Sequence, residues 1–188
     1  MRVRNVVFVL IVCVLSVSLV SSVVAAQAPA KPAAPAQGAA AQAPQIHGSL
    51  IQVMRGILFI NSNIVFAAQS EDPETIEPDE FLSLSPSALK SLYGKWMAVE
   101  NAGIAMAEAA NLLTIPGRRC SNGRPVPLQD PKWGEWVQGL RDAGMASFKA
   151  AQSRSQDAIV EVSETLTVAC ANCHERYRDV EPIINRCR

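Results

Sequence analysis

The sequence predicts an all-α fold, an antiparallel up-down-up-down four-helix bundle. Four stretches between residues 46 and 180 carry apolar residues at steps of three and four, the spacing that places them on one helix face. Two of these stretches begin with serine or aspartate followed by proline, a pair that favours a helix start. Interior prolines and the alternation typical of β-strands are both missing from the four stretches.

The first predicted helix runs from Ile46 to just before Ser70. The segment from Ser70 to Glu80 contains two prolines and six carboxylates, which disfavour helix continuation. We interpret this acidic segment as a solvated connector, with a docking patch for a basic partner as the alternative. The apolar stripe of the helix consists of Leu50, Ile51, Met54, Ile57, Leu58, Ile64 and Val65.

The second predicted helix begins at Ser85-Pro86 and ends before Pro116-Gly117. The methionine and the tryptophan of its stripe are interpreted as core residues rather than cofactor contacts. The stripe consists of Leu89, Leu92, Trp96, Val99, Gly103, Met106, Ala110 and Leu113.

The third predicted helix begins at Asp130-Pro131, and the fourth follows the polar break at residues 153–156 and runs to Tyr177 or Val180. The third stripe consists of Trp133, Trp136, Val137, Leu140, Gly144, Phe148 and Ala151, and the fourth of Ile159, Val162, Leu166, Ala169 and Cys173.

Residues 1–26 have the pattern of a signal peptide. Arg2 and Arg4 supply the positive charge, an apolar run follows from Val6 to about Val24, and small residues precede the expected cleavage. The competing interpretation is an uncleaved anchor, because about 19 apolar residues can span a bilayer. Cys13 lies inside the apolar run without the context of a lipid attachment site. We therefore expect a periplasmic or otherwise exported protein.

The chain after the signal peptide divides into a linker and one domain. Residues 27–45 are nearly all Ala, Pro and Gln, a composition that predicts disorder, whereas residues 46–188 are long enough for a core. Loss of Arg2 and Arg4 leaves 15 basic and 17 acidic side chains. This balance gives no indication of nucleic-acid binding.

The residues that carry chemistry are Cys170-Ala-Asn-Cys173-His174, the C-x-x-C-H signature of covalent haem attachment. Two thiols at this spacing can add to the two vinyl groups on one porphyrin edge, and the adjacent histidine can then ligate the iron. The sequence therefore predicts one haem c held by Cys170, Cys173 and His174.

Three other fates of the cysteines compete with haem. A thiol redox centre prefers its first cysteine at a helix N-terminus, whereas this motif ends a predicted helix. A zinc site could combine the motif with Cys120 and Cys187, but those two are single cysteines rather than a second C-x-x-C. A disulfide within the motif is the third alternative.

The C-terminal position of this motif gives the chain a resemblance to a known family. A four-helix bundle with C-x-x-C-H on its last helix and a basic residue four positions after the histidine, here Arg178, resembles the cytochrome c-prime family of class II c-type cytochromes. Trp133 and Trp136 at the start of the third helix also match. The Pro-Ala linker, the acidic loop and the insertion at residues 118–125 depart from that pattern.

The resemblance implies either electron transfer or the binding of small gases such as nitric oxide and carbon monoxide, depending on the sixth iron position. The expected partner is a redox protein or a diatomic gas, and a second copy of the chain is a further candidate. We do not expect an enzyme, because the domain has only His47 and His174 and no Ser-His-acid set can be assembled around them.

The remaining cysteines predict a disulfide between Cys120 and Cys187. Haem uses the other two thiols, and an oxidising compartment rarely leaves a pair of free ones. In an up-down-up-down bundle the ends of the second and fourth helices lie together, which makes the bridge feasible.

The sixth iron ligand is the least determined part of the site. The start of the first helix is expected beside the end of the fourth, which makes Met54 the leading candidate. The alternatives are an open five-coordinate iron covered by Leu50, Ile51 or Met54, and ligation by His47.

Overall fold

The computed structural model describes residues 43–187, and this part of the chain is all-α, with helices and no strand. The predicted signal peptide and residues 27–42 of the predicted linker lie outside the described residues. Residues 43–45 precede the first helix, are exposed and have no regular structure.

The first helix is continuous but changes type twice. It consists of α1 (Leu50–Val53), a π-helical turn (Met54–Leu58) and α2 (Phe59–Ala67). It begins at Leu50, four residues later than predicted. Ser49 is the N-cap, and its backbone N–H donates to Gln52 Oε1 at 2.8 Å, as in a capping box. By length and composition alone, this helix could cross a membrane. Of residues 50–67, 22% are buried inside the structure.

The second predicted helix start, at Ser85-Pro86, is wrong. Helix α3 spans Lys95–Ala109 and continues as a 3₁₀ turn at Ala110–Thr114. The Ser85 hydroxyl accepts from the N–H of Ser87, and both serines keep extended backbones, so this serine forms a local turn instead of a cap.

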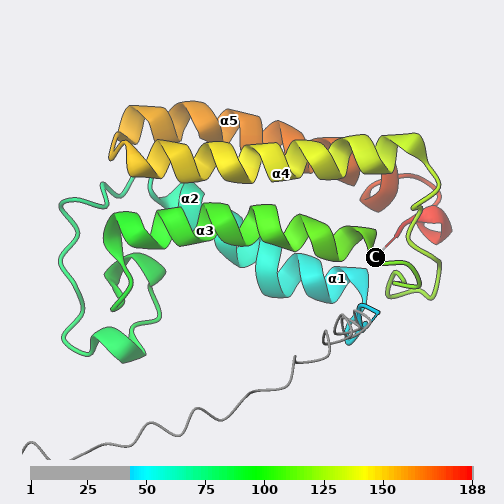
Figure 1. Cartoon of the computed structure of the whole chain (residues 1–188), viewed down its shortest axis with the longest axis horizontal. Coiled ribbons are helices and arrows are strands. Elements are labelled where there is room, and N and C mark those ends of the chain that lie inside the picture. The colour runs from blue at the N-terminus through cyan, green and yellow to red at the C-terminus, as the bar shows by residue number, and fades with distance from the viewer. Residues whose placement is uncertain (1–42, 188) are drawn as a thin grey trace, which may run out of the picture. The chain divides into compact units, whose positions relative to one another are not determined.

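The chain reaches α3 through a tight turn at Gly94. A Cβ on this residue would collide with the carbonyl oxygen of Leu89, which excludes every side chain there. Leu89 stays buried through a short 3₁₀ turn at Ala88–Lys90, whereas Leu92 is exposed. Residues 70–94 therefore form a loop outside the long helices, drawn in green at the lower left of Figure 1.

The last two helix starts are confirmed. Helix α4 (Pro131–Gln152) is capped by Asp130, whose side chain accepts from the N–H of Lys132 at 3.0 Å. Helix α5 (Gln156–Cys173) is capped by Ser155 and continues as a π-helical turn at His174–Arg178. This end lies within the predicted range.

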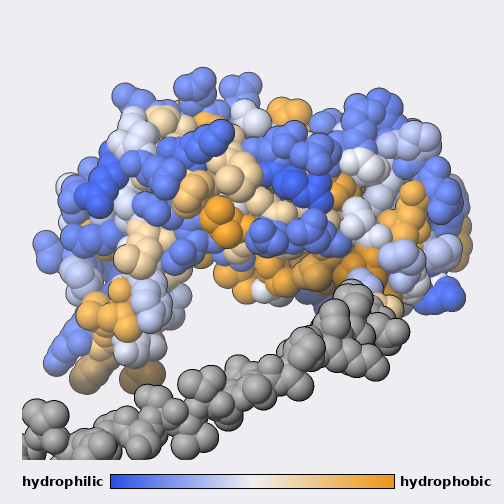
Figure 2. Space-filling model, viewed as in Figure 1, coloured by the Kyte–Doolittle hydropathy of each residue, from blue (hydrophilic) through white to orange (hydrophobic). Residues whose placement is uncertain are grey.

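The helices pack α3 against α4, α4 against α5, and α2 against both α3 and α5. The α3–α4 contact is so close that a Cβ on Gly103 would lie 2.6 Å from the backbone nitrogen of Phe148. A Cβ on Gly144 would lie 2.8 Å from the nitrogen of Ala107. Apolar side chains also remain on the surface along the lower edge of the molecule, where α1 and α2 run (Figures 1 and 2). Phe59 and Ile60 of the first helix are exposed.

Candidate functional site

One large cavity, with a volume of about 1140 Å³, separates the first helix from the end of α5. This volume is slightly above the range of about 300 to 1,000 Å³ that is typical of ligand and cofactor sites. The residues that line the cavity come from the first helix, the second half of α3, the start of α4 and the end of α5. Four segments that are distant in sequence therefore form one cavity. The large apolar side chains that line it are Leu50, Ile51, Met54, Leu58, Phe59, Phe66, Met106, Leu113, Trp133, Trp136, Val137 and Leu140.

Two of the segments that line the cavity are π-helical turns. One turn begins at Met54 and the other at His174, where the N–H of Asp179 donates to the carbonyl of His174 at 2.8 Å. Such turns insert an extra residue into a helix and are frequent at functional sites, because they redirect side chains. The two residues predicted as axial ligands thus begin the two irregular turns of the site.

His174 lies half-buried in the cavity wall. Burial lowers the pKa of its imidazole, and the nearby positive charge of Arg178 lowers it further, while Asp179 acts in the opposite direction. The neutral imidazole is therefore favoured, and this is the form that can donate an electron pair to a metal.

Cys170 and Cys173 are free, half-buried and part of the same wall. Burial raises the pKa of both thiols, and that of Cys173 reaches about 11 because the neighbouring Cys170 adds to the effect. A thiol redox centre needs the opposite shift, since the thiolate is its nucleophile. The raised pKa values of the two thiols therefore disfavour thiol redox chemistry, and the two cysteines are not joined to each other in this structure.

Cys120 and Cys187 are joined in a disulfide, with their Cα atoms 5.0 Å apart, which is the pairing expected from the sequence. The bridge removes both residues as zinc ligands. Within residues 43–187, no group of three or more His, Cys, Asp or Glu side chains is arranged to hold a metal ion.

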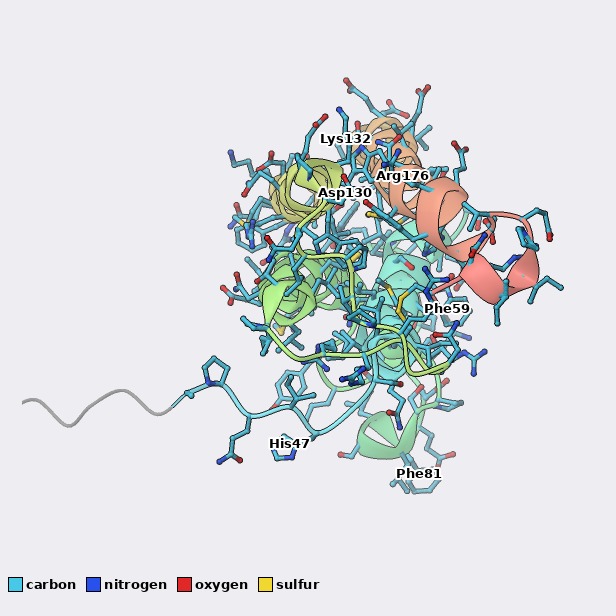
Figure 3. All side chains as sticks on the ribbon, turned by 90° about the vertical axis from the view of Figure 1, so that its right-hand side faces the viewer. His47, Phe59, Phe81, Asp130, Lys132 and Arg176 are labelled. Atoms are coloured by element: carbon cyan, nitrogen blue, oxygen red, sulfur yellow. A yellow bond between two sulfur atoms is a disulfide. The ribbon has the colours of Figure 1, made fainter. Side chains whose placement is uncertain are left out.

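An aromatic and acidic cluster fixes the end of α5 against the start of α4. The Tyr177 ring packs edge-to-face on Trp133 and Trp136, with centroids 5.1 Å and 5.8 Å away. Its hydroxyl donates to Asp130 at 2.8 Å, and Arg176 binds the same carboxylate at 2.9 Å (Figure 3). Desolvation and this hydrogen bond raise the pKa of Tyr177 to about 12. The cluster holds the wall that carries His174.

The structure brings most of the predicted site residues together. Cys170, Cys173, His174, Met54 and Arg178 all line the cavity. His47 does not line it. This residue precedes the first helix instead of lying inside it, and Figure 3 shows it below the helices, apart from Asp130 and Arg176.

Among the cavity residues that were not predicted as site residues are Met106 and Arg186. Met106 lies on α3 and is fully buried, and its place on the apolar stripe had predicted a core residue. Arg186 belongs to the segment after α5, where no helical periodicity gave a signal. Its proximity to the disulfide at Cys187 was the one hint in the sequence.

The residues of the cavity fit a haem. The porphyrin body is apolar, and so is most of the lining. Two thiols at C-x-x-C spacing and a neutral imidazole share one wall, while a thioether at Met54 lies on the first helix. Cys170 and Cys173 could hold the vinyl groups and His174 the iron.

No known protein family, curated protein or solved structure matches the chain. The resemblance to the cytochrome c-prime family therefore rests on the motif and on the order of the helices.

Proposed function

We propose that the protein is an exported monohaem c-type cytochrome that transfers electrons. The single observation that carries the proposal is the position of the C-x-x-C-H motif. Cys170, Cys173 and His174 line an apolar cavity of cofactor size, with both thiols free. Haem bound there would supply a one-electron couple, whose potential the axial ligands set.

We also propose that the helices form an antiparallel up-down-up-down bundle like that of the cytochrome c-prime family. The cavity supports this topology, because the first helix lines it from Leu50 onward and Met106 lines it near the end of α3. Trp133 at the start of α4 and His174 after α5 complete the set. This combination is the one expected when each helix reverses the direction of the one before it.

Covalent attachment is the direct test of the function. Co-expression with a haem-maturation system should give a coloured protein that keeps its pigment through acid-acetone extraction, with a mass one haem above the mature chain. Replacing both Cys170 and Cys173 by alanine should abolish attachment, whereas the exposed Ser121→Ala should leave it unchanged. Freely extractable pigment, or a colourless protein, would contradict the proposal.

The sixth ligand decides between electron transfer and gas binding. If Met54 ligates the iron, Met54→Ala should convert a low-spin spectrum to high-spin and lower the midpoint potential, because a methionine ligand raises it. Met97→Ala is the matched control, since Met97 is exposed on α3 and does not line the cavity. Met106→Leu tests the second cavity methionine at nearly constant volume.

Gas binding is the second candidate, and the apolar side chains beside Met54 favour it. Leu50 and Ile51 line the same part of the cavity and offer the iron no electron pair. A wild-type protein that is already high-spin, binds carbon monoxide, and is unchanged by Met54→Ala would replace electron transfer by gas binding as the function.

A further inference from the structure

The segment after α5 is fastened to the insertion before α4, and we call residues 118–126 together with residues 179–187 the clasp. The disulfide joins its two halves. Asn122 Nδ2 donates to the carbonyl of Arg186 at 2.5 Å, and Arg124 Nη1 donates to the carbonyl of Ile184 at 3.0 Å. The N–H of Cys187 donates to the carbonyl of Tyr177 at 2.7 Å, which ties the clasp to the cavity wall.

The clasp places a cation in the lining of the cavity. Three arginines line it: Arg55, Arg178 and Arg186. The side chain of Arg178 is 55% exposed, and its Nε and Nη2 both bind Asp179 at 2.7 Å. The side chain of Arg186 is only 19% exposed, so it is more deeply buried than that of Arg178.

The hydrogen bonds of Arg186 leave part of its guanidinium unused. Nε donates to the carbonyl of Val180 at 2.8 Å, and Nη2 pairs with Glu181. Nη1 has no hydrogen-bond partner within residues 43–187. Glu181 is 69% exposed, and an ion pair with such an exposed carboxylate contributes little. A largely buried guanidinium in the cavity lining, with one accessible and unpaired nitrogen, can accept a further anion as a partner.

We propose that Arg186 binds a propionate carboxylate of the haem. This inference rests on the proposed function. Haem has an apolar body and two carboxylates at one edge, so an apolar cavity that holds it also needs cations where those carboxylates lie. The unpaired Nη1 of Arg186 can donate to a carboxylate oxygen, and the positive charge of the guanidinium strengthens that hydrogen bond.

The disulfide gives this interaction its stability. Because Cys187 is bridged and the Arg186 carbonyl is held by Asn122, the backbone of Arg186 is fixed before the haem is bound. A fixed cation loses little conformational entropy on binding, so the interaction is preorganised.

The test compares Arg186→Gln with Arg119→Gln in the haem-loaded protein. Arg119 is an exposed arginine of the same clasp and does not line the cavity. Removing the cation at Arg186 should shift the propionate bending band in resonance Raman spectra. It should also lower the midpoint potential, because a nearby positive charge disfavours ferric haem. Arg186→Lys should recover the potential, and Arg119→Gln should leave both readouts near wild type.

The result that overturns the proposal is a Raman band and potential of Arg186→Gln equal to those of Arg119→Gln. If Arg186→Gln does not fold by circular dichroism, the Cys120→Ser/Cys187→Ser variant releases the tail instead. It should then show the same band shift, and an unchanged band overturns the proposal. A wild type without covalent haem refutes the proposed function, a separate outcome.

Discussion

The two sides of α4 are held in different ways. Against α3 the contact is made by backbone on backbone, with Gly103 facing Gly144 and no room for a methyl group. On the side of the first helix and α5, the same body contains a cavity of about 1140 Å³. The cavity side is closed by a disulfide, by the hydrogen bonds of the clasp and by the Tyr177 cluster.

The difference shows how a small helical protein can keep a large cavity. Close packing stabilises a protein through many small dispersion contacts, and a cavity loses those contacts on its walls. A covalent bridge acts differently, because it stabilises mainly by restricting the unfolded chain. The closely packed α3–α4 pair is therefore the rigid part of the fold. On the cavity side, the disulfide compensates for the packing contacts that the cavity removes.

The largest expected effect comes from removing the bridge. The disulfide closes a loop of 67 residues. The Cys120→Ser/Cys187→Ser variant should lose about 4 kcal/mol of unfolding free energy by the chain-entropy account. Urea denaturation of wild type and variant, in the same haem state, measures the difference. A loss below about 1 kcal/mol would mean that the clasp hydrogen bonds suffice and that the comparison is wrong.

The next effect concerns the close contact. Gly103→Ala should destabilise the protein by about 3 kcal/mol, because the added methyl group meets backbone that cannot rotate away. Gly139→Ala is the matched control, since a Cβ there has no neighbour within 4 Å. That control should gain about 0.5 to 1 kcal/mol from the better helix propensity of alanine. Equal behaviour of the two variants in thermal denaturation would show that the α3–α4 pair is not rigid.

Alkaline pH should weaken the cavity side selectively. The folded-state pKa of Tyr177, about 12, lies above the ordinary tyrosine value of 10.0. Its contribution is therefore complete below pH 10 and is lost as the pH rises to about 12. Tyrosinate absorbance should show this late titration, and Asp130→Ala should move it to lower pH.

The Tyr177→Phe variant supplies the control for this pH dependence. Without the hydroxyl, stability should fall less steeply between pH 10 and 12 than in wild type. Parallel curves for the two proteins would assign the alkaline loss to other groups.

The smallest effect tests the turn between α4 and α5, which belongs to neither side. Arg154 has φ 52°, a left-handed backbone that costs a non-glycine residue about 1 to 2 kcal/mol. Arg154→Gly should stabilise by up to about 1 kcal/mol after the greater freedom of glycine in the unfolded chain is subtracted. Ser153→Gly, at an ordinary helical φ of −72°, should destabilise instead. Differential scanning calorimetry can resolve both shifts.

The sequence predicted the helices wherever the local signals agreed. Asp130 caps α4 and Ser155 caps α5, and both act through hydrogen bonds to the next turn that residue type alone anticipates. The same reasoning failed at Ser85, because its hydroxyl bonds to Ser87 and Asp79 instead. Whether a serine caps a helix or forms a turn depends on the backbone that follows, and the stripe continuing through Leu92 concealed the break at Gly94.

The candidate site also contains residues that the sequence predicted and residues that it did not. Cys170, Cys173 and His174 are neighbours in sequence, so any fold brings them together. Met54 lines the same cavity, as expected from its place on the apolar stripe of the first helix and from the expected position of that helix beside the fourth. The bridge to Cys120 was predicted, but the position of Arg186 was not, because the path of the segment after α5 also depends on hydrogen bonds to Asn122 and Arg124. Such long-range constraints leave no periodic signal in the chain.

The shallow burial of the first helix has a consequence for hydrogen exchange. Leu50, Val53, Leu58 and Val65 are its buried large residues, while Phe59 and Ile60 are exposed. Segments with few buried apolar contacts open locally at a lower free energy than the rest of a domain. The amide hydrogens of residues 50–67 should therefore exchange before those of α3 and α4. A ligand that fills the cavity, such as the proposed haem, would slow that exchange, because it would add apolar contacts to the side chains of this helix.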